Sequence, residues 1–196
     1  DPQDVDKSPE DISESVGDHI AIAAYLLHYF WPLVEKDRLE NNKGSLNYQR
    51  TLDMVLAQSI GHIAELPSTQ GVQQTPEERR IEIVSTAEIF GELPRRNGFN
   101  RELFNAYEEY LEQKTDEANL AHALSGLATM FYIFSRPSTI GKQLVGGKGY
   151  ALEDYREHIR KFCNQFPNSV GNFYTLIEKF FHRERYFAES RVYKNE

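Results

Sequence analysis

The chain has 196 residues, of which 40% are hydrophobic, and this length suits one domain with a sizeable core. Its formal net charge of -8 argues against a dedicated binder of nucleic acid or of anionic membranes, because phosphates would be repelled. Cys163 is the single cysteine, which excludes an internal disulfide, so we expect a cytoplasmic location or another reducing compartment. No apolar run reaches the length of a membrane span.

The first part of the chain predicts a short arm followed by a long helix. Residues 1–12 are acidic and polar and predict a flexible arm, whereas 13–196 predict a single helical domain. Ser13 can cap the first helix, whose apolar positions recur at helical spacing. Pro32 is expected to kink or end this helix, and the NNKG stretch at 41–44 predicts a turn.

Capping signals mark the helices that follow. A second helix is predicted from about residue 46 to 64. A third starts at the N-cap Thr75, with Pro76 at the first helical position and Glu78 completing the capping box. Thr115 is predicted to cap a fifth helix. The third to seventh predicted helices cover about residues 76–93, 100–113, 115–134, 152–165 and 169–187. Strand alternation is not seen, so the sequence predicts an all-α fold, a compact bundle of about seven helices.

Two further stretches invite a binding function and do not support one. GKQLVGGKG (141–149) lacks the P-loop spacing, because the first glycine of that motif would fall on Lys142 and its hydroxyl residue on Gly149. We interpret the loop 136–149 as a connection whose glycines serve turns. The C-terminal run 181–196 mixes bases and aromatics with glutamates, which favours a solvated helix face over a nucleic-acid site.

Four segments together resemble one family. ESVGDHIAIAAYLL (14–27), MVLAQSIGHIAEL (54–66), TPEERRIEIVSTAEIFGELP (75–94) and YEEYLEQKTDEANLAHALSGLATM (107–130) resemble, in order and spacing, the corresponding helices of HD-domain phosphohydrolases of the 5′-deoxynucleotidase branch. The resemblance covers about residues 13–134. It implies an HD-like helical fold.

In such enzymes a divalent metal is held by an early His, an adjacent His-Asp pair and a distant Asp, and it polarises phosphate and activates water. The resemblance places the early His on His19. The His-Asp pair falls on Gln58 and Ser59, and the distant Asp on Ser125. Three of the four ligand positions are therefore changed, and both carboxylates are among them.

Other positions of the family motif also depart from it. The catalytic Glu falls on His62, and a later Asp falls around Pro67. The family's Arg-bearing N-terminal helix has no counterpart upstream of Glu14. Neutral Gln and Ser are poor metal ligands, so the resemblance implies that the family's site does not operate here as it does in the enzymes.

One alternative is a displaced metal site. His62 lies four residues after Gln58, and His122 lies three before Ser125, so each shares a helix face with a former ligand position. With His19 they could hold a divalent metal such as zinc. We nevertheless expect no metal. The candidate pocket comprises His19, Gln58, Ser59, His62, His122 and Ser125.

We therefore expect a catalytically degenerate HD-domain protein, a pseudoenzyme that acts as a binding, regulatory or structural subunit. The alternatives are an enzyme with a repurposed pocket, using the displaced His site or metal-free chemistry on a small ligand, and a residual metal-dependent nucleotidase. The expected partners are another protein or a second copy of the chain, and a small molecule or nucleotide. No nucleic-acid or membrane partner is expected.

Overall fold

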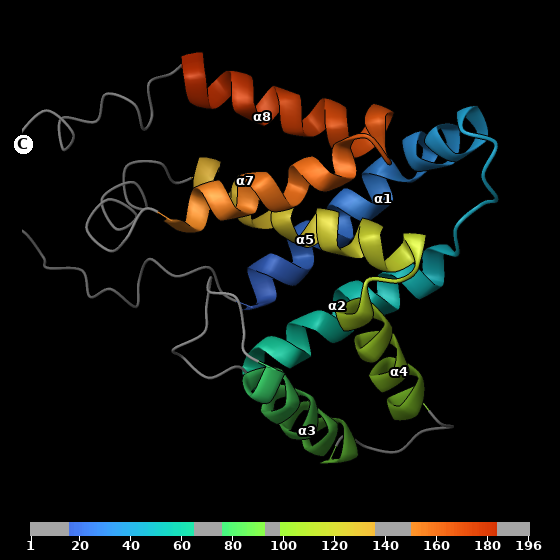
Figure 1. Ribbon diagram of the computed structural model, residues 1–196, viewed down its shortest axis with the longest axis vertical. Helices are drawn as coiled ribbons and strands as arrows, with labels where there is room; N and C mark the ends of the chain where they lie inside the picture. The colour runs from blue at the N-terminus through green and yellow to red at the C-terminus, as the bar shows by residue number, and fades with distance from the viewer. Residues whose placement is uncertain (1–15, 65–75, 93–98, 136–149, 184–196) are drawn as a thin grey trace, which may run out of the picture.

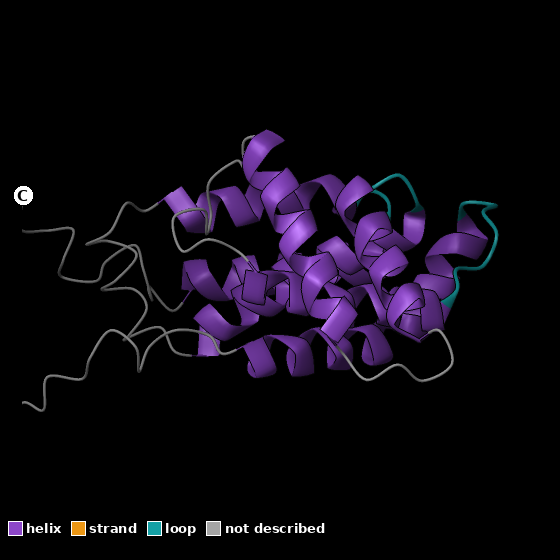
Figure 2. Cartoon of the chain, turned by 90° about the horizontal axis from the view of Figure 1, so that it is seen from below, coloured by secondary structure: helices purple, strands orange, loops and turns teal. Residues whose placement is uncertain are grey.

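A computed structural model describes residues 16–64, 76–92, 99–135 and 150–183 of the chain. Within these ranges seven α-helices and one π-helical turn are present and no strand occurs (Figures 1 and 2), which confirms the predicted all-α bundle. The predicted arm at 1–12, the glycine-rich loop 136–149 and most of the C-terminal run 181–196 lie outside the described residues.

The observed helices agree closely with the predicted ranges. They are α1 (Val16–Glu40), α2 (Tyr48–Ala64), α3 (Pro76–Glu92), α4 (Phe99–Glu112), α5 (Asp116–Ser135), α7 (Tyr150–Cys163) and α8 (Asn172–Arg183), with the π-turn η2 (Pro167–Gly171) before α8.

The central helix is α5, which packs against α1, α2, α4, α7 and α8. It is apolar around much of its circumference, as expected for a helix surrounded by others. Helices α7 and α8 cover one side of it, while α3 and α4 lie at the opposite end of the molecule (Figure 1). There α3 packs against α2 and α4, and α4 packs against both α2 and α5. The three helices α1, α2 and α5 pack against one another in pairs.

Several predicted caps and turns can be compared with the structure. The Ala118 amide donates to the Thr115 hydroxyl at 3.2 Å, which confirms Thr115 as the cap of α5. Asn42 adopts a positive φ of 52° in the turn after α1, a conformation that Asn tolerates well. The predicted caps Ser13 and Thr75 lie outside the described residues.

Two helix boundaries differ from the prediction. Of the two outcomes expected at Pro32, a kink or an end of the helix, the end does not occur, because α1 continues through Pro32 to Glu40. Pro32 lies on the exposed side of the helix, so the carbonyl group that loses its partner there faces solvent. The last helix does not begin at residue 169, because 167–171 form the π-turn η2 and α8 starts at Asn172.

A buried carboxylate explains why the chain forms η2 there. Asp37, at the end of α1, is 0% exposed. Its Oδ1 accepts hydrogen bonds from the amide and the side chain of Asn168, at 2.8 and 2.7 Å, and its Oδ2 accepts from the amide and the hydroxyl of Ser169, at 3.2 and 2.9 Å. The first amides of η2 thus find their acceptor in Asp37 of α1, which lies 131 positions before Asn168 in the chain.

An ion-pair cluster lies at the same end of α1. Arg38 donates to Asp116 at the start of α5 and, at 2.7 Å, to the carbonyl of Gly44. Gln165 donates to the other carboxylate oxygen of Asp116 at 2.6 Å. These bonds join α1, the start of α5 and the turn that follows α7, and so connect three segments that are distant in the sequence.

Candidate functional site

His19 and Ser125 meet between α1 and α5. His19 Nε2 and Ser125 Oγ are 3.0 Å apart, and His19 is only 8% exposed. His19 Nδ1 lies 3.5 Å from the hydroxyl of Thr129, one turn further along α5. In either neutral tautomer one ring nitrogen donates and the other accepts. Both ring nitrogens of His19 are therefore within reach of hydroxyl groups of α5.

Gln58 occupies a buried position on the third helix of this group. It lies on α2 and is 3% exposed, and α2 packs against both α1 and α5. The structure thus places three of the predicted pocket residues, His19, Gln58 and Ser125, on three mutually packed helices. The side chains of Ser59 and His62 lie outside the described residues, although the backbone of both positions belongs to α2.

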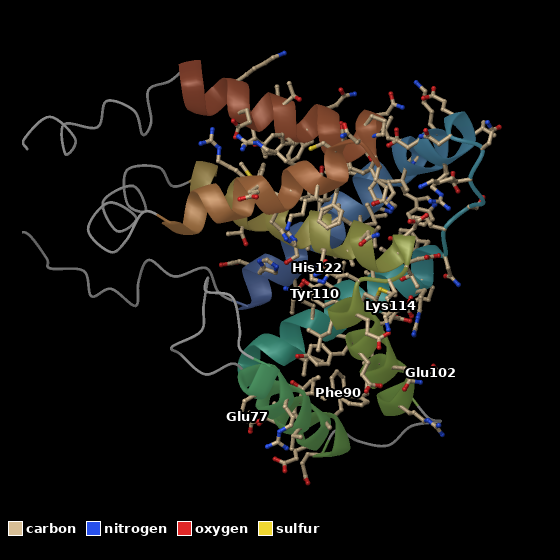
Figure 3. All side chains as sticks on the ribbon, viewed as in Figure 1. Glu77, Phe90, Glu102, Tyr110, Lys114 and His122 are labelled. Carbon is tan, nitrogen blue, oxygen red and sulfur yellow. The ribbon has the colours of Figure 1, made fainter. Side chains whose placement is uncertain are left out.

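His122 is directed towards α4. Its ring stacks on the Tyr110 ring, with centroids 3.7 Å apart and planes inclined by 8°, and Figure 3 labels the two residues side by side. His122 Nε2 lies 2.8 Å from the carbonyl oxygen of Tyr110, and Nδ1 lies 3.3 Å from Gln113 Nε2.

These contacts determine the proton position on His122. A carbonyl oxygen only accepts, so Nε2 carries the proton and donates it to Tyr110, and Nδ1 accepts from the Gln113 amide. The Tyr110 carbonyl lies in the last turn of α4 and also accepts from the backbone amide of Gln113 at 3.3 Å, so His122 adds a second donor to an acceptor at the helix end. The contacts of His122 are accounted for by a capping role.

A second histidine lies beside His122. The ring of His158, on α7, is 5.6 Å from that of His122 at an angle of 61°, and 5.3 Å from that of Phe162. Burial first, and then the charge of Lys161, lower the pKa of His158 below its ordinary value. The neutral form of this imidazole is therefore favoured in the folded protein.

The backbone of α5 approaches α7 closely next to Ser125. An added methyl group at Gly126 would lie 2.9 Å from Cγ1 and 3.2 Å from Cδ1 of Ile159, which is fully buried. Glycine at this position therefore sets the spacing of the two helices directly beside the His19–Ser125 contact.

The donor chemistry at the described positions that the sequence resemblance assigns to metal ligands does not fit a divalent metal. An amide and a hydroxyl carry no charge, and only His19 is an imidazole. Among the side chains that the structure describes, no group of three or more His, Cys, Asp or Glu is arranged to hold a metal ion.

None of the helices within the described residues has the length and apolar character that crossing a membrane requires.

Sequence reasoning missed Thr129 of this site and Asp37 at the other end of α1. Thr129 was not among the candidates, although its spacing of four residues from Ser125 places both on one face of α5. Asp37 was missed because its partners lie at the other end of the chain.

Comparison of the chain with models of known protein families, with curated proteins and with solved structures finds no match in any of the three.

Proposed function

We propose that the chain is a catalytically degenerate HD-like domain that acts as a binding, regulatory or structural subunit. The observation that carries this proposal is the 3.0 Å contact between His19 Nε2 and Ser125 Oγ. The resemblance assigns both positions to metal ligands. A hydroxyl in the place of a carboxylate bonds directly to the imidazole that would otherwise face an ion.

Charge supports the same proposal. Carboxylates provide much of the attraction that retains a divalent ion, and they also keep its histidine partners oriented. Gln58 and Ser125 contribute no charge. The buried position of Gln58, which is 3% exposed, also matches a side chain that completes the packing between helices.

The contacts of His122 favour this proposal over a displaced histidine site. Binding a metal through His122 Nε2 would remove the proton that this atom donates to Tyr110. Binding through Nδ1 would displace the Gln113 amide. Either change would remove one of the hydrogen bonds that join His122 of α5 to the end of α4.

The proposal is tested by metal analysis and phosphate release on the purified full chain. We expect substoichiometric metal after dialysis against Mn²⁺ or Zn²⁺, and no phosphate release from deoxynucleoside monophosphates above the level of a His19→Ala variant. A stoichiometric ion, or hydrolysis that His19→Ala abolishes, would contradict the proposal. Loss of a bound ion in both His62→Ala and His122→Ala would establish the displaced site instead.

A further inference from the structure

The side of α1 that faces away from the core carries an apolar ridge. Tyr25 and Tyr29 are 64% and 61% exposed, and Leu33 is 36% exposed. Ala21, also exposed, continues the same four-residue spacing. Residues four apart form a ridge along a helix, and such ridges pack into the grooves of a second helix. Grouped exposed aromatic side chains are typical of an interaction site.

The tyrosine rings of this ridge are held in place before any partner binds. The Tyr25 and Tyr29 rings are stacked, with centroids 6.1 Å apart and planes inclined by 14°. Tyr29 also meets Phe30 edge to face at 5.5 Å, and Phe30 is 3% exposed and contacts Phe173 of α8 at 5.1 Å. Rings supported in this way lose little conformational freedom on binding, so more of the contact energy contributes to affinity.

The ridge lies in an uncharged part of an acidic chain. Residues 19–34 contain no Asp, Glu, Lys or Arg, whereas the whole chain has a formal net charge of -8. Two copies of such an acidic chain repel each other overall, and a contact surface without carboxylates avoids adding close like-charge contacts to this repulsion. Interface cores, and homodimer interfaces in particular, are depleted in charge and enriched in tyrosine.

The ridge is complementary to itself in an antiparallel arrangement. A two-fold axis beside position 27 places Tyr25 of one copy opposite Tyr29 of the other, and Ala21 opposite Leu33. The same axis brings Asp18 of each copy near Lys36 of the other, and both residues are exposed. Tyrosines thus face each other at the centre, a small side chain faces a larger one on either side of them, and opposite charges meet at both ends, as an interface formed by the same patch on both subunits requires.

We propose that the chain forms a symmetric homodimer through the outer face of α1, centred on Tyr25 and Tyr29. This inference goes beyond the proposed function and does not depend on it. One helix face from each copy corresponds to an interface of about 1,000–1,200 Å² in total, at the lower end for specific complexes. We therefore expect a dimer that dissociates at micromolar concentration.

Sedimentation equilibrium of the full chain tests the dimer. The wild type is expected to shift from 22.7 kDa towards twice this mass as its concentration rises through the micromolar range. The double variant Tyr25→Glu/Tyr29→Glu should weaken association at least about tenfold, because truncating or charging central tyrosines removes interface hot spots. The matched control is Val84→Glu on α3, a position 48% exposed, which should leave association unchanged.

Cross-linking tests the arrangement independently. In a Cys163→Ser background, oxidised His28→Cys should give a covalent dimer, because position 28 is exposed and lies next to the expected axis, whereas Val84→Cys should not. A wild type that stays monomeric up to millimolar concentration would overturn the inference. A dimer that Tyr25→Glu/Tyr29→Glu does not weaken would also overturn it, provided that the circular dichroism and unfolding midpoint of this variant match the wild type. Equal cross-linking at positions 28 and 84 would overturn it as well.

Discussion

The imidazole of His19 and the hydroxyl of Ser125 lie 3.0 Å apart, although the two residues are 106 positions apart in the chain. This contact fixes the relation of α1 to α5 at the positions that the sequence resemblance assigns to metal ligands. It also limits the chemistry of the site, because the Ser125 hydroxyl orients the imidazole but adds no negative charge that could attract a metal ion.

We expect the His19–Ser125 contact to contribute measurably to stability. Ser125→Ala and His19→Ala should each lower the free energy of unfolding, and the double variant should lose less than the sum, with a coupling energy of about 1 kcal/mol. Urea unfolding of the four proteins measures this coupling. Strict additivity would show that the contact contributes nothing, and Thr129→Val reports separately on the weaker 3.5 Å contact.

Asp37 is expected to be among the most sensitive positions of the fold. Both of its carboxylate oxygens accept from backbone amides, so Asp37→Asn would place an amide NH₂ against a donor. We expect a loss of about 2–4 kcal/mol in the free energy of unfolding. The control is Glu40→Gln, one turn further along α1, where the exposed carboxylate accepts from the Asn168 side chain and forms a surface ion pair with Lys36. Equal effects of the two substitutions in urea unfolding would contradict this view.

The close approach of α5 to α7 at Gly126 can be tested by a glycine-to-alanine substitution, with Gly91 on α3 as the matched control. Gly91→Ala on α3 meets no atom within 4 Å and should stabilise the protein by about 0.5–1 kcal/mol, because alanine favours the helix. Gly126→Ala should instead destabilise it by about 1–3 kcal/mol, because the new methyl group overlaps buried Ile159. In an Ile159→Ala background the cost of Gly126→Ala should fall. Stabilisation by both alanines would show that the helices separate without penalty.

The depressed pKa of His158 predicts a defined pH dependence. The unfolded chain takes up its proton below about pH 6.5, whereas the folded chain resists protonation until lower pH. Stability from this group is therefore complete above pH 6.5 and is lost as pH falls through the interval down to the folded pKa. His158→Phe keeps the ring contacts and removes the titration.

Unfolding midpoints between pH 7.5 and pH 5.5 check this dependence. The wild type should lose more stability over that range than His158→Phe. A parallel dependence in both proteins would assign the pH effect to other groups. The ion pair of Glu178 with Arg156 does not interfere with this measurement. Burial opposes ionisation of Glu178, but the hydrogen bond and charge of Arg156 outweigh burial and hold the pKa of Glu178 below its ordinary value. The stability that this ion pair contributes is therefore lost only at more acidic pH.

Local sequence patterns predicted most of the fold because helix periodicity and capping are short-range. Seven helices were expected and seven occur in the described residues, and Thr115 caps α5 as expected. The predicted start of the last helix was wrong, because this segment depends on Asp37. The Asp37 carboxylate accepts from the amides of Asn168 and Ser169, which lie 131 and 132 positions later in the chain. Such long-range bonds leave no periodic signal in the sequence.

The candidate site was predictable only in part for the same reason. Spacing places Ser125 and Thr129 on one face of α5 and Gln58 on α2, but it does not say that His19 meets α5. That expectation came from the resemblance, and the position of His122 against Tyr110 was not expected at all. Its aromatic stacking and its bond to a helix-end carbonyl are tertiary contacts between α4 and α5.

Restoring the ligands is the most direct test of a degenerate HD-like site. Gln58→His, Ser59→Asp and Ser125→Asp together with His19 recreate the four donors that the family uses, if α1, α2 and α5 bring these positions together. Calorimetric titration with Mn²⁺ should show one bound ion per triple variant, no ion in the wild type, and none after His19→Ala is added to the triple variant. A triple variant that keeps wild-type helical content and binds no ion would contradict the account, as would a wild type that binds one.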